Sequence, residues 1–187
     1  MDAFSYLAVL LSIVLGLGLT QLLTATGRLI RHRDRVHVQW LPLLWAAILL
    51  LIYVQVWWSM YGLRLRHEWT FLDFCIVLAQ TATLYLMAAV VLPEQVEEEG
   101  IDLQAHFDQQ HRWFFGFFLA TLVISVAKDV ILGGQLPDGT NLGFHAVFVV
   151  GCLTGLFARR QRYQEMLVIG FAVAIVAYIG VLFTRLD

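Results

Sequence analysis

Charged residues are scarce in this sequence. Asp, Glu, Lys and Arg make up only 14% of the 187 residues, whereas 60% are hydrophobic, and soluble domains typically carry about 25% charged residues. A soluble domain of this composition would have too little polar surface to cover its core. The net charge of −2 and the lack of a basic stripe also argue against nucleic acid as a partner.

Cysteine is nearly absent as well, with Cys75 and Cys152 as the two instances. Both fall inside long apolar segments at different expected depths. We therefore expect neither a disulfide nor a metal site there and interpret them as small core residues. The sequence also lacks a positively charged start, because Asp2 follows Met1, and no small-residue cleavage pattern ends the first apolar segment. We expect no cleavable signal peptide.

Six apolar segments remain, each about long enough to cross the hydrocarbon layer of a membrane. They are residues 4–24, 42–60, 71–92, 113–132, 142–158 and 166–184. The strict alternation of membrane strands is absent, and helices satisfy every backbone polar group of such segments in lipid. The sequence therefore predicts an all-α polytopic integral membrane protein, in which residues 1–187 form a single domain of six transmembrane helices.

The longest connecting segment, residues 93–112, is predicted to contain a short amphipathic helix before the fourth span, because Leu103, Phe107 and Phe114 share one helical face. Acids and histidines in this segment have a helical spacing that suggests a metal site: Glu98, Asp102, His106, Asp108 and His111. A single exposed helix rarely closes a coordination shell, so we expect no metal ion. We expect Glu97, Glu98 and Glu99 to pair with arginines instead.

Arginine is distributed unequally between the two sides of the predicted bundle. The first, third and fifth connecting segments contain Arg28, Arg31, Arg33, Arg35, Arg112, Arg159, Arg160 and Arg162. The opposite side has Arg64, Arg66 and Arg185, with Lys128 near its rim. Because basic residues of short loops stay in the cytoplasm, we expect the first group there and both termini on the non-cytoplasmic side.

The stretch SIVLGLGLTQLL and the arginine-rich turn after it resemble small bacterial membrane proteins of no assigned activity. The resemblance covers the first third of the chain and implies no functional residue. We expect the protein to be integral to a bacterial inner membrane, with membrane lipids as partners.

Small residues recur along several of the predicted helices. The first span has them at intervals of four: Ala8, Ser12, Gly16, Thr20 and Thr24. Gly151 and Gly155 form a G-x-x-x-G pair in the fifth span, which lets a neighbouring backbone come close. Two interpretations stay open. These faces pack inside one bundle, or they bind a second copy or a partner membrane subunit.

Lys128 and Asp129 are adjacent charges within an otherwise apolar run. The fifteen residues from Trp113 to Ala127 make about 22 Å of helix, which is too short for a hydrocarbon core of about 30 Å. Continuing the helix to Leu132 gives a sufficient length, so the pair is predicted to lie in its last turn and a half. A lysine there can snorkel, but a short aspartate cannot reach the surface as easily.

Other polar residues are expected near this pair, at the non-cytoplasmic ends of the helices. The predicted ligand-binding set is Lys128, Asp129, Asp73, Gln80, Gln55, Ser125 and His145. We interpret it as a pocket that binds or conducts a small polar solute, an ion or a lipid headgroup. An alternative is a structural ion pair of Lys128 with Asp73 or Asp129. Another is a non-enzymatic accessory subunit of a larger membrane complex. We identify no catalytic residue and expect no cofactor.

Overall fold

The structure is a computed structural model that describes residues 3–66, 68–95, 100–158 and 160–182. The helices are α1 (Ala3–Arg31), α2 (Trp40–Ser59), α3 (Phe71–Val91), α4 (Leu103–Gly133), α5 (Gly139–Phe157) and α6 (Gln161–Leu182). Short elements connect them: η1 (Arg33–Arg35), β1 (Val36–His37), η2 (Met60–Leu65) and β2 (Ile101–Asp102). Seven residues of the sequence analysis lie outside the described part: Met1, Asp2, Glu97, Glu98, Glu99, Arg159 and Arg185.

All six of these helices are long and apolar enough to cross a membrane, which confirms the predicted fold class. Many large apolar side chains point outward, as expected for a surface covered by lipid. On α4, for example, Val123 and Val130 are 63% and 40% exposed. The helices extend beyond the predicted spans, most clearly in α1, which continues to Arg31.

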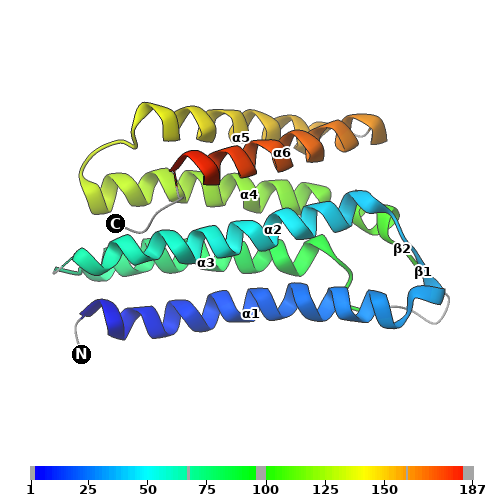
Figure 1. Cartoon of the computed structure of the whole chain (residues 1–187), viewed down its shortest axis with the longest axis horizontal. Coiled ribbons are helices and arrows are strands. Elements are labelled where there is room, and N and C mark those ends of the chain that lie inside the picture. Colours follow the sequence, from blue (N-terminus) through cyan, green and yellow to red (C-terminus); the bar gives the residue numbers. More distant parts are fainter. Residues whose placement is uncertain (1–2, 67, 96–99, 159, 183–187) are drawn as a thin grey trace.

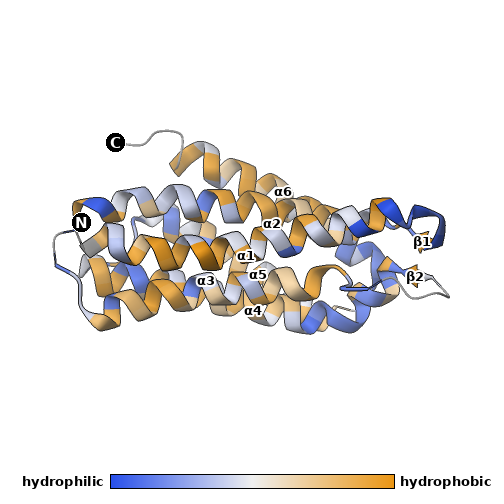
Figure 2. Cartoon of the chain, turned by 90° about the horizontal axis from the view of Figure 1, so that it is seen from below, coloured by the Kyte–Doolittle hydropathy of each residue, from blue (hydrophilic) through white to orange (hydrophobic). Residues whose placement is uncertain are grey.

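Consecutive helices run antiparallel and pack in the order α1, α3, α4, α5, α6 and α2, with α2 returning to α1 (Figure 1). Helix α2 also contacts α3 and α4 and is the most buried of the six. The bundle has two distinct ends. The Lys128 end is where α1, α3 and α5 begin and α2, α4 and α6 end. The arginine-rich end is where α1 ends and the turn with η1 and β1 follows (Figure 2).

Aromatic rings fill the centre of the bundle. Trp45 of α2 is fully buried and packs with ring centroids 5.1 Å from Phe114, 5.4 Å from Phe115 and 5.1 Å from Phe171. Phe118 joins the cluster at 5.4 Å from Phe171. Tilted and edge-to-face packing of this kind is preferred by aromatic quadrupoles, so these rings form a dense core that links α2, α4 and α6.

The segment expected to form a separate surface helix is the beginning of α4. It is helical as predicted, but it continues into the fourth span without a break. Its apolar residues Leu103 and Phe107 are fully buried, so they pack on the bundle and do not lie on a membrane surface. At 1.5 Å per residue, the 31 residues of α4 make about 46 Å of helix. The helix therefore extends beyond the hydrocarbon layer at the arginine-rich end.

A two-residue parallel strand pair closes the arginine-rich end. Val36 pairs with Ile101 and His37 with Asp102, which joins the α1–α2 turn to the start of α4. Gly100 precedes β2 with φ of 92°, and a Cβ there would lie 2.6 Å from the carbonyl oxygen of Arg35. Glycine is required at this position by its conformation and by the close backbone approach.

Candidate functional site

A cavity of about 310 Å³ opens among the helices at the Lys128 end. Side chains from α2, α3, α4, α5 and α6 line it, and a narrow extension of about 50 Å³ continues from it toward the bundle centre. Helix α4 places Lys128 and Asp129 at this cavity because it continues to Gly133 and ends at Gly134, whose φ of 66° is left-handed. The predicted position of the charged pair near the end of the fourth helix is thereby confirmed.

Most of the predicted ligand-binding residues come together here. Gln55, Gln80, Ser125, Lys128 and Asp129 line the cavity. His145 lines the extension together with Gln55, Gln80 and Ser125. Asp73 lines neither space. Whether the residues that share the cavity bind a ligand stays a prediction.

Lys128 is the only lysine of the chain, and its side chain is half-buried, as is that of Asp129. Within the described residues, the ion pairs join Arg33 to Asp34 and Arg66 to Asp73, and neither includes Lys128. The alternative in which Lys128 pairs with Asp73 is therefore wrong. The carboxylate of the adjacent Asp129 interacts electrostatically with Lys128, and both residues line the cavity. The alternative of a structural pair between Lys128 and Asp129 therefore stays open. An acceptor or anion in the cavity would further stabilise the half-buried ammonium.

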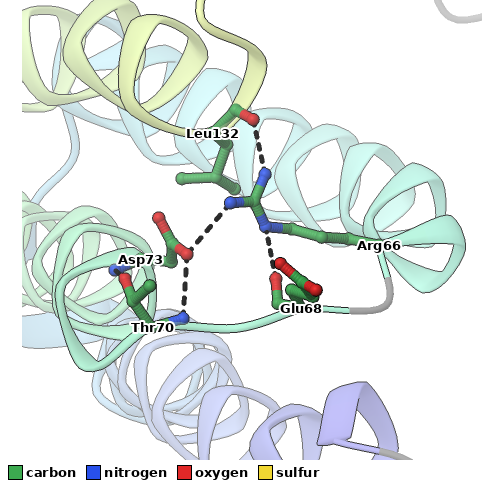
Figure 3. Close-up of polar contacts among 5 residues, drawn as sticks. All are labelled: Arg66, Glu68, Thr70, Asp73 and Leu132. Atoms are coloured by element: carbon green, nitrogen blue, oxygen red, sulfur yellow. Dashed lines mark hydrogen bonds and ion pairs between the residues drawn. The ribbon is translucent and has the colours of Figure 1, made fainter.

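Asp73 is instead held by a network at the edge of the bundle (Figure 3). Its carboxylate accepts hydrogen bonds from the backbone N–H of Thr70 at 2.9 Å and from Arg66 Nη2 at 3.0 Å. The backbone N–H of Asp73 donates to Thr70 Oγ1 at 3.2 Å, which completes a capping box at the start of α3. The sequence signal for this role was the Thr-x-x-Asp spacing immediately before an apolar run.

Gln80 carries the strongest indication of an unfilled binding position. The side chain is only 3% exposed and lines both the cavity and its extension, and its Oε1 has no hydrogen-bond partner in the described part of the chain. A buried carbonyl without a partner costs about 1–3 kcal/mol, and native proteins rarely leave one without a protein group, water or ligand. The amide oxygen of Gln80 is thus available to a hydrogen-bond donor inside the cavity.

Asn141 and Tyr178 also line the cavity and were missed from the sequence. Tyr178 donates from its hydroxyl to Asn141 Oδ1 at 3.3 Å, and His145 Nδ1 donates to the backbone carbonyl of Asn141 at 3.0 Å. The sequence that ends at Asn141, Pro-Asp-Gly-Thr-Asn, has turn composition and conceals its helical position. The structure makes Asp138 the N-cap of α5, which brings Asn141 into the first turn of that helix.

Beyond the cavity extension, the described part of the bundle is packed with aromatic rings. Phe118 and Phe148 line the extension at its deep end, and Phe171 packs against both, with ring centroids at 5.4 Å and 5.6 Å. The buried Trp45 cluster follows toward the arginine-rich end. These packed rings make the lining beyond the extension mainly apolar.

Comparison with protein-family models, with curated proteins and with solved structures finds no match to this chain.

Proposed function

We propose that the protein binds a small polar solute, an ion or a lipid headgroup in the cavity at the Lys128 end, and that this end faces the non-cytoplasmic side of the membrane. The single observation that carries the proposal is the buried Oε1 of Gln80, which has no hydrogen-bond partner among the described residues and lies in a space bordered by Lys128 and Asp129. These three groups favour a ligand that presents an acceptor or negative charge to the ammonium and a donor to the amide and carboxylate oxygens.

The aromatic rings at the deep end of the cavity favour binding of a solute over its conduction through the protein. A conducting path needs polar groups or water at every depth, because a charged or strongly polar solute is costly in a dry apolar environment. Phe118, Phe148 and the rings around Trp45 occupy that position in the bundle. The proposed role is therefore that of a membrane-embedded receptor or carrier of a ligand that enters and leaves at one end.

A thermal-shift screen tests this proposal. The detergent-purified protein is heated with a panel of small anions, cations, zwitterions and soluble lipid headgroups, and at least one class is expected to raise its Tm. The Lys128→Leu variant should remain folded and lose that shift, because a charge-assisted hydrogen bond contributes about 1.5–3 kcal/mol to binding. Arg112→Leu is the matched control, since Arg112 lies on the same helix at the opposite end and does not line the cavity.

Two results would contradict the proposal. In the first, no member of the panel protects the wild-type protein. In the second, Lys128→Leu and Arg112→Leu retain the same protection, which would place the ligand elsewhere. A Lys128→Leu variant that fails to insert or fold would favour a purely structural role for Lys128.

A further inference from the structure

A second space lies between α1 and α2 on the half of the bundle toward the arginine-rich end. This groove has a volume of about 520 Å³ and an almost entirely apolar lining. Leu22 and Ile30 of α1 mark its extent along that helix, and Ala47 and Leu50 contribute from α2. Among the described residues, Arg33, at the start of η1 just after α1, is the only charged one that lines it.

Small side chains create the groove. Ala46, Ala47 and Thr26 occupy positions where a leucine would fill the space between the two helices. Ala47 is exposed, so the groove opens toward the surface of the bundle. On a transmembrane helix pair that surface is covered by acyl chains, and an apolar groove there is filled by hydrocarbon.

The groove is slightly shorter than one leaflet of a bilayer is thick. The eight-residue step from Leu22 to Ile30 corresponds to about 12 Å of helix. Half of a hydrocarbon core of about 30 Å is about 15 Å. The part of an acyl chain nearest the headgroup therefore fits along the groove, with the headgroup at Arg33, where α1 has ended and η1 begins.

Arg33 is suited to a phosphate group. Its guanidinium is 4.0 Å from the carboxylate of Asp34, and the two side chains are 76% and 90% exposed. Exposed pairs at this distance contribute little to stability, so the guanidinium remains accessible. Arginine binds phosphate through two parallel hydrogen bonds. The neighbouring Arg31 and Arg35 are exposed too and add positive charge at this end.

We propose that this groove is a binding site for one anionic phospholipid, with an acyl chain between α1 and α2 and the headgroup phosphate on Arg33. The site is at the opposite end of the bundle from the cavity of Lys128. This proposal therefore does not depend on the proposed ligand-binding function.

Native mass spectrometry of the detergent-purified protein tests the proposal. The protein is titrated with phosphatidylglycerol and with phosphatidylcholine of identical acyl chains, and the affinity for the first bound lipid is compared. Phosphatidylglycerol should bind more tightly. Arg33→Gln should weaken its binding about fivefold, the equivalent of the roughly 1 kcal/mol that a basic residue contributes near an anionic lipid. Arg160→Gln, an exposed arginine at the same end that does not line the groove, should have a smaller effect.

A second pair of variants tests the groove itself. Ala47→Leu fills it from an exposed position, so the fold should be retained while the first molecule of either lipid binds more weakly. Ala82→Leu makes the same change at an exposed position of α3 outside the groove and should leave lipid binding unchanged. Equal affinity for the two lipids in the wild-type protein would overturn the proposal. Equal lipid affinity of Ala47→Leu and Ala82→Leu would also overturn it. So would a wild-type protein dimer that Ala47→Leu dissociates, because a second copy of the chain would then occupy the groove.

Discussion

At the residue scale, Arg66 joins three separate parts of the chain. Its guanidinium donates to the carboxylate of Asp73 in α3, to the backbone carbonyl of Glu68 and to the backbone carbonyl of Leu132 at the end of α4 (Figure 3). The last turn of a helix has unpaired carbonyls and a partial negative charge. Arg66 therefore satisfies one carbonyl of α4 while it neutralises a carboxylate at the start of α3.

We expect Arg66→Gln to destabilise the protein by about 2 kcal/mol, because the side chain of Asp73 is only 4% exposed and would lose a charged hydrogen bond. Arg33→Gln in lipid-free detergent is the matched control. Its ion pair with Asp34 is almost fully exposed, so its loss should cost less than about 0.5 kcal/mol. Thermal unfolding in detergent measures the loss of stability in both variants. Equal losses would show that the Arg66 network contributes no more than a surface pair.

The partner of Asp73 could not be predicted from helix spacing. Depth and helical periodicity placed Asp73 at the correct end of α3, since both follow from local sequence. Its actual partner lies in the connection between α2 and α3, and the direction of such a segment depends on tertiary packing. Lys128 consequently does not pair with Asp73, and its place beside Asp129 in the cavity lining is the reason we propose it as a ligand contact.

At the scale of elements, the G-x-x-x-G pair of α5 packs inside the bundle. A Cβ on Gly151 would lie 2.4 Å from a ring carbon of Phe171, and a Cβ on Gly155 would lie 2.6 Å from Cζ of Phe115. Both glycines thus receive an aromatic ring from a neighbouring helix. On α1, by contrast, Ser12, Thr20 and Thr24 of the small-residue series are exposed. Association through that face stays a prediction.

Gly155→Ala should destabilise the protein by about 1–3 kcal/mol, the usual effect of overpacking a core. The ring of Phe115 has little freedom to move, because it is fully buried against Trp45. Gly143 on the same helix is the control, because a Cβ there would have no neighbouring atom within 4 Å. Gly143→Ala should stabilise the protein by about 0.5–1 kcal/mol. Thermal unfolding checks the stabilities, and mass measurement in detergent checks the oligomeric state. A loss of dimer in Gly155→Ala without a loss of stability would favour the self-association interpretation.

The helices themselves were predictable because apolar length is a local property of the sequence. Their boundaries were less so. Nothing between Leu103 and Gly133 breaks a helix by steric necessity, since the nearest prolines are Pro93 and Pro137. The beginning of α4 buries its apolar face on the bundle, a contact that composition cannot distinguish from burial on a membrane surface.

At the scale of the whole molecule, the two ends of the bundle differ in charge and in the spaces they contain. The Lys128 end has a polar cavity, and aromatic rings around Trp45 pack in the middle of the bundle. The arginine-rich end has an apolar groove with Arg33 at one end. Sequence patterns grouped Gln55, Gln80, Ser125, Lys128 and Asp129 at one end because depth can be counted along each helix. They could not identify Tyr178, since a tyrosine in an apolar span is typical of ordinary core packing.

The orientation of these ends determines which compartment the cavity serves, and accessibility labelling can measure it. On a background of Cys75→Ala and Cys152→Ala, we expect Gln135→Cys, exposed between α4 and α5, to react with a membrane-impermeant maleimide in intact cells. Asp34→Cys, in the arginine-rich turn, should react only after the membrane is permeabilised, because loops rich in arginine are retained in the cytoplasm. The reverse pattern would direct the cavity of Lys128 toward cytoplasmic ligands. It would also move Arg33 and its groove to the opposite leaflet. Either pattern thus decides from which side the proposed ligand would reach Gln80 and Lys128.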